Sequence, residues 1–344
     1  MPTQNSRWVL NSFPDGAPTE DCWRRDDAPI PEPADGEALV RAVYLSVDPY
    51  LRGRISKAAN YAAGVQIGEV MHGNGVGVVE KSRCAELPEG AVVEGFGFGW
   101  QDYSLQKPDA VRVFDPSLGP IHAALSYLGM PGITAYLTMI DTLQIKQGDR
   151  AVVSAASGAV GQIAGQIARI KGAAAVAVAG SDEKIAWCKE LGYSDGINYK
   201  TCKDLPAAMK EACPDGVDAF LDNTAGPIHD AVMLNLALGA RIAICGTMEL
   251  SNRLDQPDMG QRFLRQILTA RARMQGFIIF DHLDRFDSVR REISGWAKDG
   301  LIRHREDILD GIDAMPEAFL RLLSGRNFGK QLVRVSECPN GIAT

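Results

Sequence analysis

Three small residues, Ala156, Gly158 and Gly161, form the turn with the clearest chemical meaning in this sequence. An apolar run over 151–154 precedes the turn, and an apolar helical pattern over 160–171 follows it. A helix that begins directly after a strand points its N-terminus and several amides at a phosphate group. Glycine at 158 lets the backbone approach phosphates, and glycine at 161 lets the helix pack on its strand. The segment predicts a dinucleotide-binding turn, with alanine at 156 in place of the usual first glycine.

The end of the next predicted strand bears on which dinucleotide is bound. An acid there bonds the ribose hydroxyl of NAD, whereas a cation accepts the 2′-phosphate of NADP. The strand over 175–179 ends at Gly180, and Lys184 lies about one helical turn further on. The pair 199–200 follows the next strand and can close the same pocket. NADP is favoured, while Asp182 keeps NAD open and Lys184 can equally be a solvated helix lysine.

Strands and helices alternate around these residues. Strands are expected at 151–154, 175–179, 218–222 and 241–245, and helices at 133–143, 160–171, 183–191 and about 228–238. This alternation predicts an α/β fold with a parallel sheet covered on both faces. The residues before about 128 carry short strand signals with glycine breaks instead, which predicts a mostly antiparallel β domain.

The composition narrows the class of protein. A length of 344 residues predicts two domains, and 46% hydrophobic with 23% charged residues is ordinary for a globular chain. The formal charge of -7 argues against nucleic acid and anionic membranes as partners. We find no signal-peptide layout, no membrane-spanning apolar run and no C-x-x-C pair among the seven cysteines. These features predict a cytoplasmic protein without a disulfide framework or structural zinc.

Many ordered markers together resemble the zinc-independent medium-chain dehydrogenase/reductases. Within them the chain is similar to the branch of prostaglandin reductases, leukotriene hydroxydehydrogenases and curcumin-reductase-like enzymes. The markers lie at 46–52 (SVDPYLR), 129–136 (GMPGITAY), the Gly158 loop, 192–193, 198–200, 222–223, 244–246, 275–279 and 327–330. The resemblance implies a GroES-like β domain over 1–128, completed by about 300–344, and a Rossmann NADP-binding domain over 129–299. It also implies a homodimer.

The same resemblance implies NADP(H) as cofactor and assigns residues to it. The pyrophosphate would be held by Ser157, Gly158, Ala159 and Val160, and the 2′-phosphate by Lys184 and Tyr199. The ribose and nicotinamide would be bordered by Asn223, Cys245, Ser251, Phe277, Ile278, Ile279 and Asn327. The sequence departs from the family pattern at Thr224-Ala225, and at Ser251, where a tyrosine is usual. The second change predicts a roomier substrate pocket.

The expected chemistry uses no metal. Asp48 stands where zinc-dependent relatives carry their first cysteine ligand, and the five histidines are scattered, as surface or structural residues are. Alcohol oxidation then lacks a Lewis acid, whereas an activated carbon–carbon double bond needs none. We therefore expect an NADPH-dependent reductase of α,β-unsaturated ketones or aldehydes, with hydride added to the β-carbon. The proton to the α-carbon can come from a side chain, a cofactor hydroxyl or water.

Tyr61 is the leading candidate for substrate contact, because its phenol can bond the carbonyl oxygen or relay a proton. The alternative is a surface-loop tyrosine, and Tyr50 is a second candidate that more naturally packs beside Pro49. Cys245 is expected to be an inert buried thiol and not a nucleophile. Two other functions stay open: a quinone oxidoreductase of the same superfamily, and a catalytically silent NADPH-binding protein.

Overall fold

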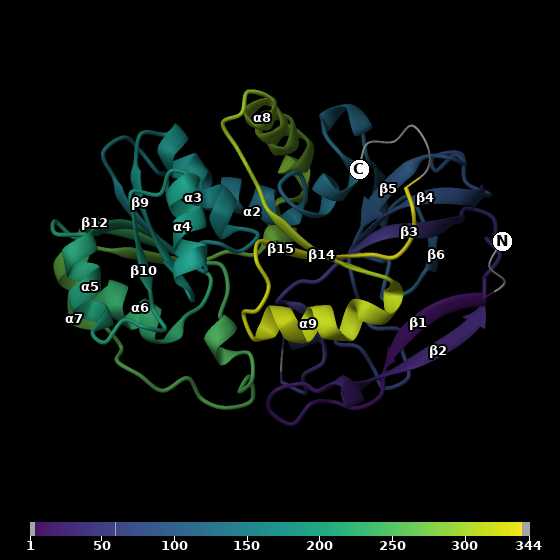
Figure 1. The fold of residues 1–344 in the computed structure, drawn as a ribbon, viewed down its shortest axis with the longest axis horizontal. Helices are drawn as coiled ribbons and strands as arrows, with labels where there is room; N and C mark the ends of the chain where they lie inside the picture. The colour runs from purple at the N-terminus through teal and green to yellow at the C-terminus, as the bar shows by residue number, and fades with distance from the viewer. Residues whose placement is uncertain (1–3, 59, 339–344) are drawn as a thin grey trace. The chain divides into compact units, whose positions relative to one another are not determined.

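The computed structural model describes residues 4–58 and 60–338 and divides the chain into two compact units (Figure 1). Unit 1 comprises Met1–Ser126, Ser251–Asp255 and Glu306–Thr344, and unit 2 comprises Tyr127–Leu250 and Gln256–Arg305. The chain therefore starts in unit 1, builds unit 2 and returns to unit 1 at its end.

Unit 2 is built on a six-stranded parallel sheet with the order β10-β9-β8-β11-β12-β13, which is that of the Rossmann fold. The strands are β8 (Arg150–Ser154), β9 (Ala174–Ala179), β10 (Asp195–Asn198), β11 (Val217–Asp222), β12 (Leu236–Ile244) and β13 (Arg273–Gly276). Val152, Val176 and Phe220 on central strands are fully buried, because helices cover a parallel sheet on both faces.

The helices of unit 2 connect these strands. They are α2 (Met130–Leu137), α3 (Gly161–Ile170), α4 (Asp182–Glu190), α5 (Leu205–Ala212), α6 (Gly226–Met233), α7 (Leu264–Ala270) and α8 (Phe286–Lys298). A π-helical turn over Thr138–Thr142 extends α2. The helix expected over 228–238 was wrong at its end: α6 stops at Met233, and β12 already begins at Leu236.

Unit 1 contains a seven-stranded, mostly antiparallel sheet and a separate two-stranded ribbon. The large sheet has the order β14-β15-β3-β4-β5-β7, with β6 also paired to β3, and among its described strand pairs only β14 and β15 run parallel. Its strands are β3 (Ala38–Ser46), β4 (Gly75–Ser82), β5 (Val92–Gly95), β6 (Tyr103–Gln106), β7 (Val111–Val113), β14 (Glu306–Asp310) and β15 (Lys330–Arg334). The ribbon pairs β1 (Gln4–Leu10) with β2 (Trp23–Pro29).

Two α-helices belong to the described part of unit 1: the short α1 (Leu51–Arg54) and α9 (Met315–Leu323), which connects β14 to β15. The core gathers aromatic rings from distant parts of the chain. The ring centroids of Trp23 and Trp100 lie 5.4 Å apart, and Phe319 of α9 packs edge-on at 5.7 Å and 5.8 Å from them. The C-terminal helix is thus part of the hydrophobic core of the N-terminal domain.

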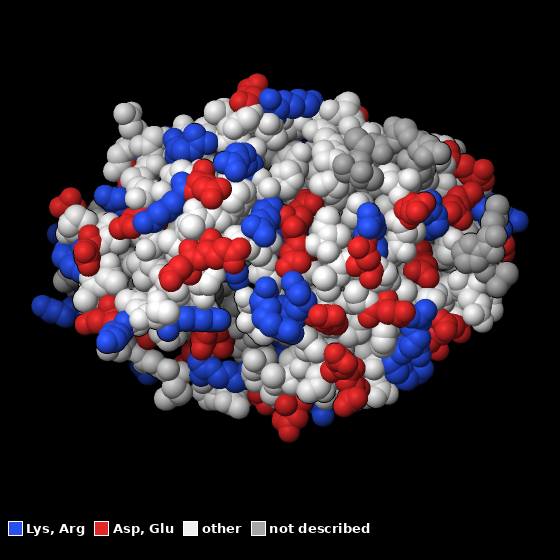
Figure 2. Space-filling view, viewed as in Figure 1, with Lys and Arg blue, Asp and Glu red and all other residues white. Residues whose placement is uncertain are grey.

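All seven cysteines are free thiols. Among the described residues, no helix is long and apolar enough to span a bilayer. On the face drawn in Figure 2, acidic and basic side chains are intermixed.

Candidate active site

The phosphate turn of unit 2 lies between β8 and α3, and tight packing shapes it. A Cβ added at Gly161 would lie 2.5 Å from the carbonyl oxygen of Ala155 and 2.6 Å from the Cα of Ala156, so only glycine fits. The left-handed backbone falls on Ala155 (φ 49°), one residue before the alanine that replaces the usual first glycine. No side chain caps the N-terminus of α3. The predicted residues 157–160 therefore lead directly into an uncapped helix end, which suits a pyrophosphate.

The end of β9 forms a small cradle around Gly180. A Cβ at Gly180 would lie 3.3 Å from the Oη of Tyr199 and 3.1 Å from the Cε of Lys200, so these two side chains flank the glycine. Tyr199 is partly exposed, and burial, followed by the charge of Glu249, raises the pKa of its phenol. Its hydroxyl therefore stays a hydrogen-bond donor at neutral pH.

Lys184 lies in the first turn of α4, directly after this cradle. The cap of α4 is Ser181, whose Oγ accepts from the amide of Lys184 at 3.3 Å. Asp182 is not the cap, and its carboxylate already accepts from the Nδ2 of Asn198 at 2.8 Å. The strand thus ends at a glycine, and two lysines and a phenol lie close by in the chain. This set of residues suits the 2′-phosphate of NADP better than the 2′-hydroxyl of NAD.

The end of β11 carries a fully buried carboxylate, that of Asp222. Its Oδ1 accepts from the amides of Thr224 (2.9 Å) and Ala225 (2.8 Å), and its Oδ2 lies 2.8 Å from the Nδ1 of His229. This network fixes the turn that departs from the family pattern. Ala225 there adopts φ 61° and ψ -157°, a conformation that favours glycine.

Asn223 is held by β8. Its amide donates to the Oγ of Ser154 and its Nδ2 to the carbonyl oxygen of Ser154, both at 2.8 Å. Among the described residues its Oδ1 accepts no hydrogen bond, so this oxygen can accept from a ligand hydroxyl.

The neighbouring strand ends carry the other predicted residues of unit 2. The amide of Cys245 donates to the carbonyl oxygen of Asp222 (2.8 Å), and that of Phe277 to the carbonyl oxygen of Ile244 (3.0 Å). Ile278 is partly exposed and Ile279 is buried. Because β11, β12 and β13 are parallel neighbours, these residues line one edge of the sheet, where ligands of such folds bind.

The remaining predicted residues, Tyr61, Ser251 and Asn327, belong to unit 1. Tyr61 is 54% exposed, in the loop that follows α1. Ser251 is buried, and the Nδ2 of Asn327 donates to the carbonyl oxygen of Gly329 at 2.9 Å. Tyr50 is fixed by a hydrogen bond from its hydroxyl to the Oδ1 of Asn74 (2.9 Å), as a packing residue would be.

Asp48 occupies the position at which zinc-dependent relatives are expected to carry a cysteine ligand, and it forms an ion pair with a lysine. The Nζ of Lys330 lies 2.6 Å from its Oδ1, the Oγ of Ser46 donates to its Oδ2 at 2.5 Å, and both charged residues are buried. Lys330 also donates to the carbonyl oxygen of Val47 (3.0 Å). An ammonium at the carboxylate would repel a second cation, so the residues do not fit a catalytic zinc at this position.

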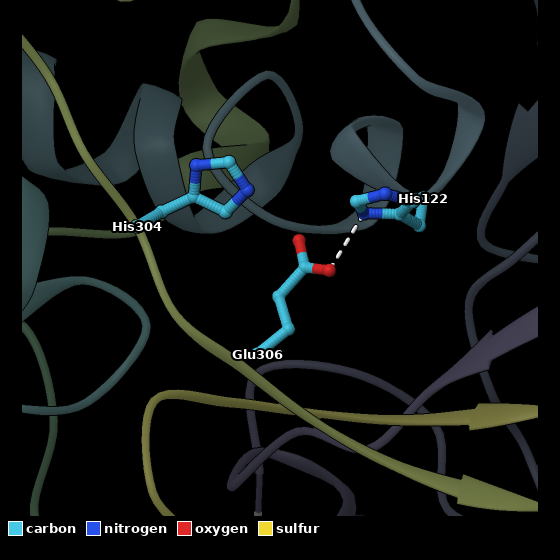
Figure 3. Close-up of side chains that lie close together, drawn as sticks. All are labelled: His122, His304 and Glu306. Carbon is cyan, nitrogen blue, oxygen red and sulfur yellow. Dashed lines mark ion pairs between the residues drawn. The ribbon is translucent and has the colours of Figure 1, made fainter. Parts of the chain in front are cut away.

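A histidine of unit 1 also has a carboxylate partner. The Nδ1 of His122 lies 2.6 Å from the Oε2 of Glu306, and Figure 3 shows this ion pair. His304, which Figure 3 also draws, belongs to unit 2, where its ring packs on Tyr127 with centroids 4.2 Å apart.

Sequence reasoning missed several residues that shape these sites. Arg54 and Lys330 are buried charges, and Asp222 and Ser154 organise the turn at Asn223. The sequence shows Lys330 as a charged residue at the start of an apolar strand and Asp222 as an acid at the end of another. Neither pattern indicates which residue the side chain contacts.

Comparisons with known proteins place the chain among oxidoreductases. Residues 6–113 match the family described as the N-terminal domain of oxidoreductase, and residues 159–294 match the family described as zinc-binding dehydrogenase. NADPH-dependent curcumin reductase of Escherichia coli is 39% identical over 97% of each chain. The NADP-dependent 2-alkenal reductase of Nicotiana tabacum is 36% identical, covering 96% of this chain and 98% of the relative.

A solved structure is equally similar. CurA of Vibrio vulnificus in complex with NADPH has a TM-score of 0.91 and 40% identity, covering 97% of this chain and all 100% of that one. The similarity thus extends over both units and not only over the common dinucleotide-binding part.

Proposed function

The chain belongs to the medium-chain dehydrogenase/reductase family, and from this premise we propose that it reduces the carbon–carbon double bond of α,β-unsaturated ketones or aldehydes with NADPH. It has a GroES-like β domain and a Rossmann domain. Similarity to curcumin and 2-alkenal reductases over nearly the whole length of the chain supports this reaction over others of the superfamily.

The observation that carries the cofactor choice is the cradle at Gly180. NADPH, when bound, supplies the hydride that the β-carbon of the substrate accepts. Lys184, Tyr199 and Lys200 would hold its 2′-phosphate, and residues 157–160 its pyrophosphate. The Oδ1 of Asn223 would accept from a ribose hydroxyl, while Cys245 and 277–279 would border the nicotinamide ring.

The protein's own contribution is placement and charge stabilisation. The substrate carbonyl already withdraws electrons from the double bond, so hydride addition leaves an enolate whose oxygen needs a hydrogen-bond donor. The phenol of Tyr61 is our candidate donor, because it is exposed on a loop of the domain that would carry the substrate. Asn327 and Ser251 would complete the site from the same unit, and no step needs a metal ion.

Turnover of matched acceptors tests the function. Purified protein with NADPH is mixed with a panel of enones, enals and quinones, and loss of reduced-nicotinamide absorbance is followed. We expect enones and enals to be reduced, with mass spectrometry showing saturation of the double bond and an intact carbonyl. Reduction of quinones alone would replace the proposal by quinone oxidoreductase activity. Tight NADPH binding without turnover of any acceptor would make the chain a cofactor-binding protein.

We propose that the protein forms a homodimer through the open edge of the unit 2 sheet. Strand β13 ends the sheet, and all four of its residues are exposed. Leu264 and Leu268 of α7 and Leu238 of β12 are also more than two-thirds exposed, an unusual apolar surface for a monomer. Light scattering should give twice the chain mass, and Leu268→Asp should lower it, whereas Val113→Asp on unit 1 should not. A monomer mass for the unmodified chain would refute this.

We place the protein in the cytoplasm, where its seven free thiols stay reduced and NADPH is available. Fractionation of cells should recover it with soluble enzymes, and enrichment in an oxidising compartment would contradict this placement.

A further inference from the structure

Arg54, the last residue of α1, lies between two tyrosine rings. Its Cζ is 5.0 Å from the ring centroid of Tyr61 and 5.4 Å from that of Tyr50. Both distances are within the range in which a guanidinium is attracted to the face of an aromatic ring. One planar cation therefore contacts both phenol side chains that the sequence singled out.

The guanidinium is buried without a carboxylate. Arg54 is only 5% exposed, and among the described residues it forms no ion pair. The guanidinium's hydrogen bond within the described part of the chain, from Nη1 to the carbonyl oxygen of Ala63, is long at 3.4 Å. Burying a charge costs free energy unless it is paired, and two ring faces compensate only part of that cost. Stability alone gives no reason for a charged side chain at this position.

The loop that carries Tyr61 begins and ends at Arg54. The chain leaves α1 at Ile55 and returns at Val65, whose amide donates to the carbonyl oxygen of Arg54 at 2.8 Å. A Cβ at Gly64 would lie 2.9 Å from that same oxygen, so the returning strand passes close to it. Both the backbone and the side chain of Arg54 therefore determine where the Tyr61 ring lies.

The neighbouring ring is fixed from two sides. The hydroxyl of Tyr50 donates to Asn74, and the face of its ring contacts Arg54. The Tyr50 ring is therefore held in place against the guanidinium. Tyr61, by contrast, is 54% exposed, and the guanidinium of Arg54 lies over its ring. An exposed phenol that must meet a substrate carbonyl gains from such an anchor, because the contact limits the orientations of its ring.

We infer that Arg54 is a positioning residue for the reduction: it clamps the Tyr61 ring against the Tyr50 side of the loop and so directs its phenol to the substrate carbonyl. The inference rests on the proposed function, since it assigns a role within that reaction. Without the guanidinium, the phenol of Tyr61 is still present, but Arg54 no longer orients it toward the substrate.

A double-mutant cycle tests the inference. Arg54→Met removes the charge at similar length, Arg54→Lys keeps the charge without the planar group, and Tyr61→Ala removes the ring. We expect Arg54→Met to lower kcat/KM for an enone about tenfold and Arg54→Lys to restore part of the loss. The Kd for NADPH should stay within about twofold, because Arg54 is not among the residues proposed to hold the cofactor. In the Tyr61→Ala background, Arg54→Met should change kcat/KM less than about twofold.

Arg303→Met serves as the matched control. Arg303 lies 5.2 Å from the ring of Trp187 in unit 2, so this variant loses a similar contact without touching the loop, and its kcat/KM should not change. Equal effects of Arg54→Met with and without Tyr61 would overturn the inference, as would full activity of Arg54→Met. If Arg54→Met does not fold, Arg54→Lys takes its place in the cycle, and its effect on kcat/KM is compared with and without the Tyr61 ring. Failure of the unmodified protein to reduce any enone would instead overturn the proposed function.

Discussion

Lys184 lies in the first turn of α4, and its neighbour Ser181 caps that helix, so its position on the backbone is fixed. If it pairs with the 2′-phosphate, Lys184→Ala should raise the Kd for NADPH about tenfold or more, since charge-assisted hydrogen bonds contribute about 1.5–3 kcal/mol. The Kd for NADH should change little. Titration of both cofactors by fluorescence measures this, with Lys189→Ala on the same helix as control. An equal rise in the Kd for NADPH and for NADH would show that Lys184 does not bind the 2′-phosphate.

Ala225 occupies a backbone region that favours glycine, and this predicts a stabilising substitution. Ala225→Gly should relieve strain of about 1–3 kcal/mol while costing about 0.5–1 kcal/mol of chain entropy. The net gain expected in the free energy of unfolding is about 1 kcal/mol, measured by urea denaturation. Ala231→Gly inside α6 should lower stability, and a loss at both positions would show that Ala225 is unstrained.

Cys245 tests whether a thiol takes part in the reaction. Burial, with a smaller contribution from Asp222, raises its pKa to about 12. The thiolate form exists only near and above that pKa, so at pH 9 it amounts to about one part in a thousand. Cys245→Ser should therefore keep kcat within about twofold, and alkylation at this position should stay slow from about pH 7 to 9. Rapid labelling with loss of activity would contradict the inert role.

At the scale of elements, the junction of β8 and α3 depends on the absence of a side chain at 161. Gly161→Ala would place a Cβ against backbone atoms of Ala155 and Ala156, which cannot move without shifting the turn. We expect a loss of about 1–3 kcal/mol in stability and at least tenfold weaker NADPH binding. Gly295→Ala in α8, with open space around it, should instead be neutral or stabilising. Unfolding curves and cofactor titrations of both variants decide.

Elements were predictable where local pattern alone decides them. The apolar runs that became β8 and β9 and the glycine turn before α3 were readable, because a buried parallel strand and its helix leave a continuous local signal. The end of α6 was not, because the leucines of 234–238 continue an apolar helical pattern into residues that pair with β11. Strand pairing, which is a tertiary effect, decided that boundary.

At the scale of the whole molecule, the C-terminal segment is tied to the N-terminal sheet by a buried ion pair. Lys330→Met leaves Asp48 charged and unpaired, which should cost about 3–5 kcal/mol. Replacing both partners, as in Asp48→Leu with Lys330→Met, should recover much of that loss. Urea denaturation measures both variants. A Lys330→Met protein as stable as the unmodified chain would show that the pair contributes nothing.

The same pair shows where sequence reasoning stops. Asp48 and Lys330 are 282 residues apart, and nothing in the sequence near either one names the other. For the cofactor, the sequence allows a prediction, because the candidate residues follow strand ends in order along the chain, and these assignments stay a prediction. For the substrate side, the sequence allows no such prediction of Arg54, because this residue acquires its two ring contacts only when the loop after α1 folds back.

The lysine at Asp48 has a consequence for how this protein is maintained in a cell. Because Lys330 supplies the positive charge at that carboxylate, this position needs no metal ion, and the protein cannot be inactivated by losing an ion from it. Prolonged dialysis against a chelator should leave its turnover unchanged, so nutrient conditions that starve metalloenzymes would leave this reductase working.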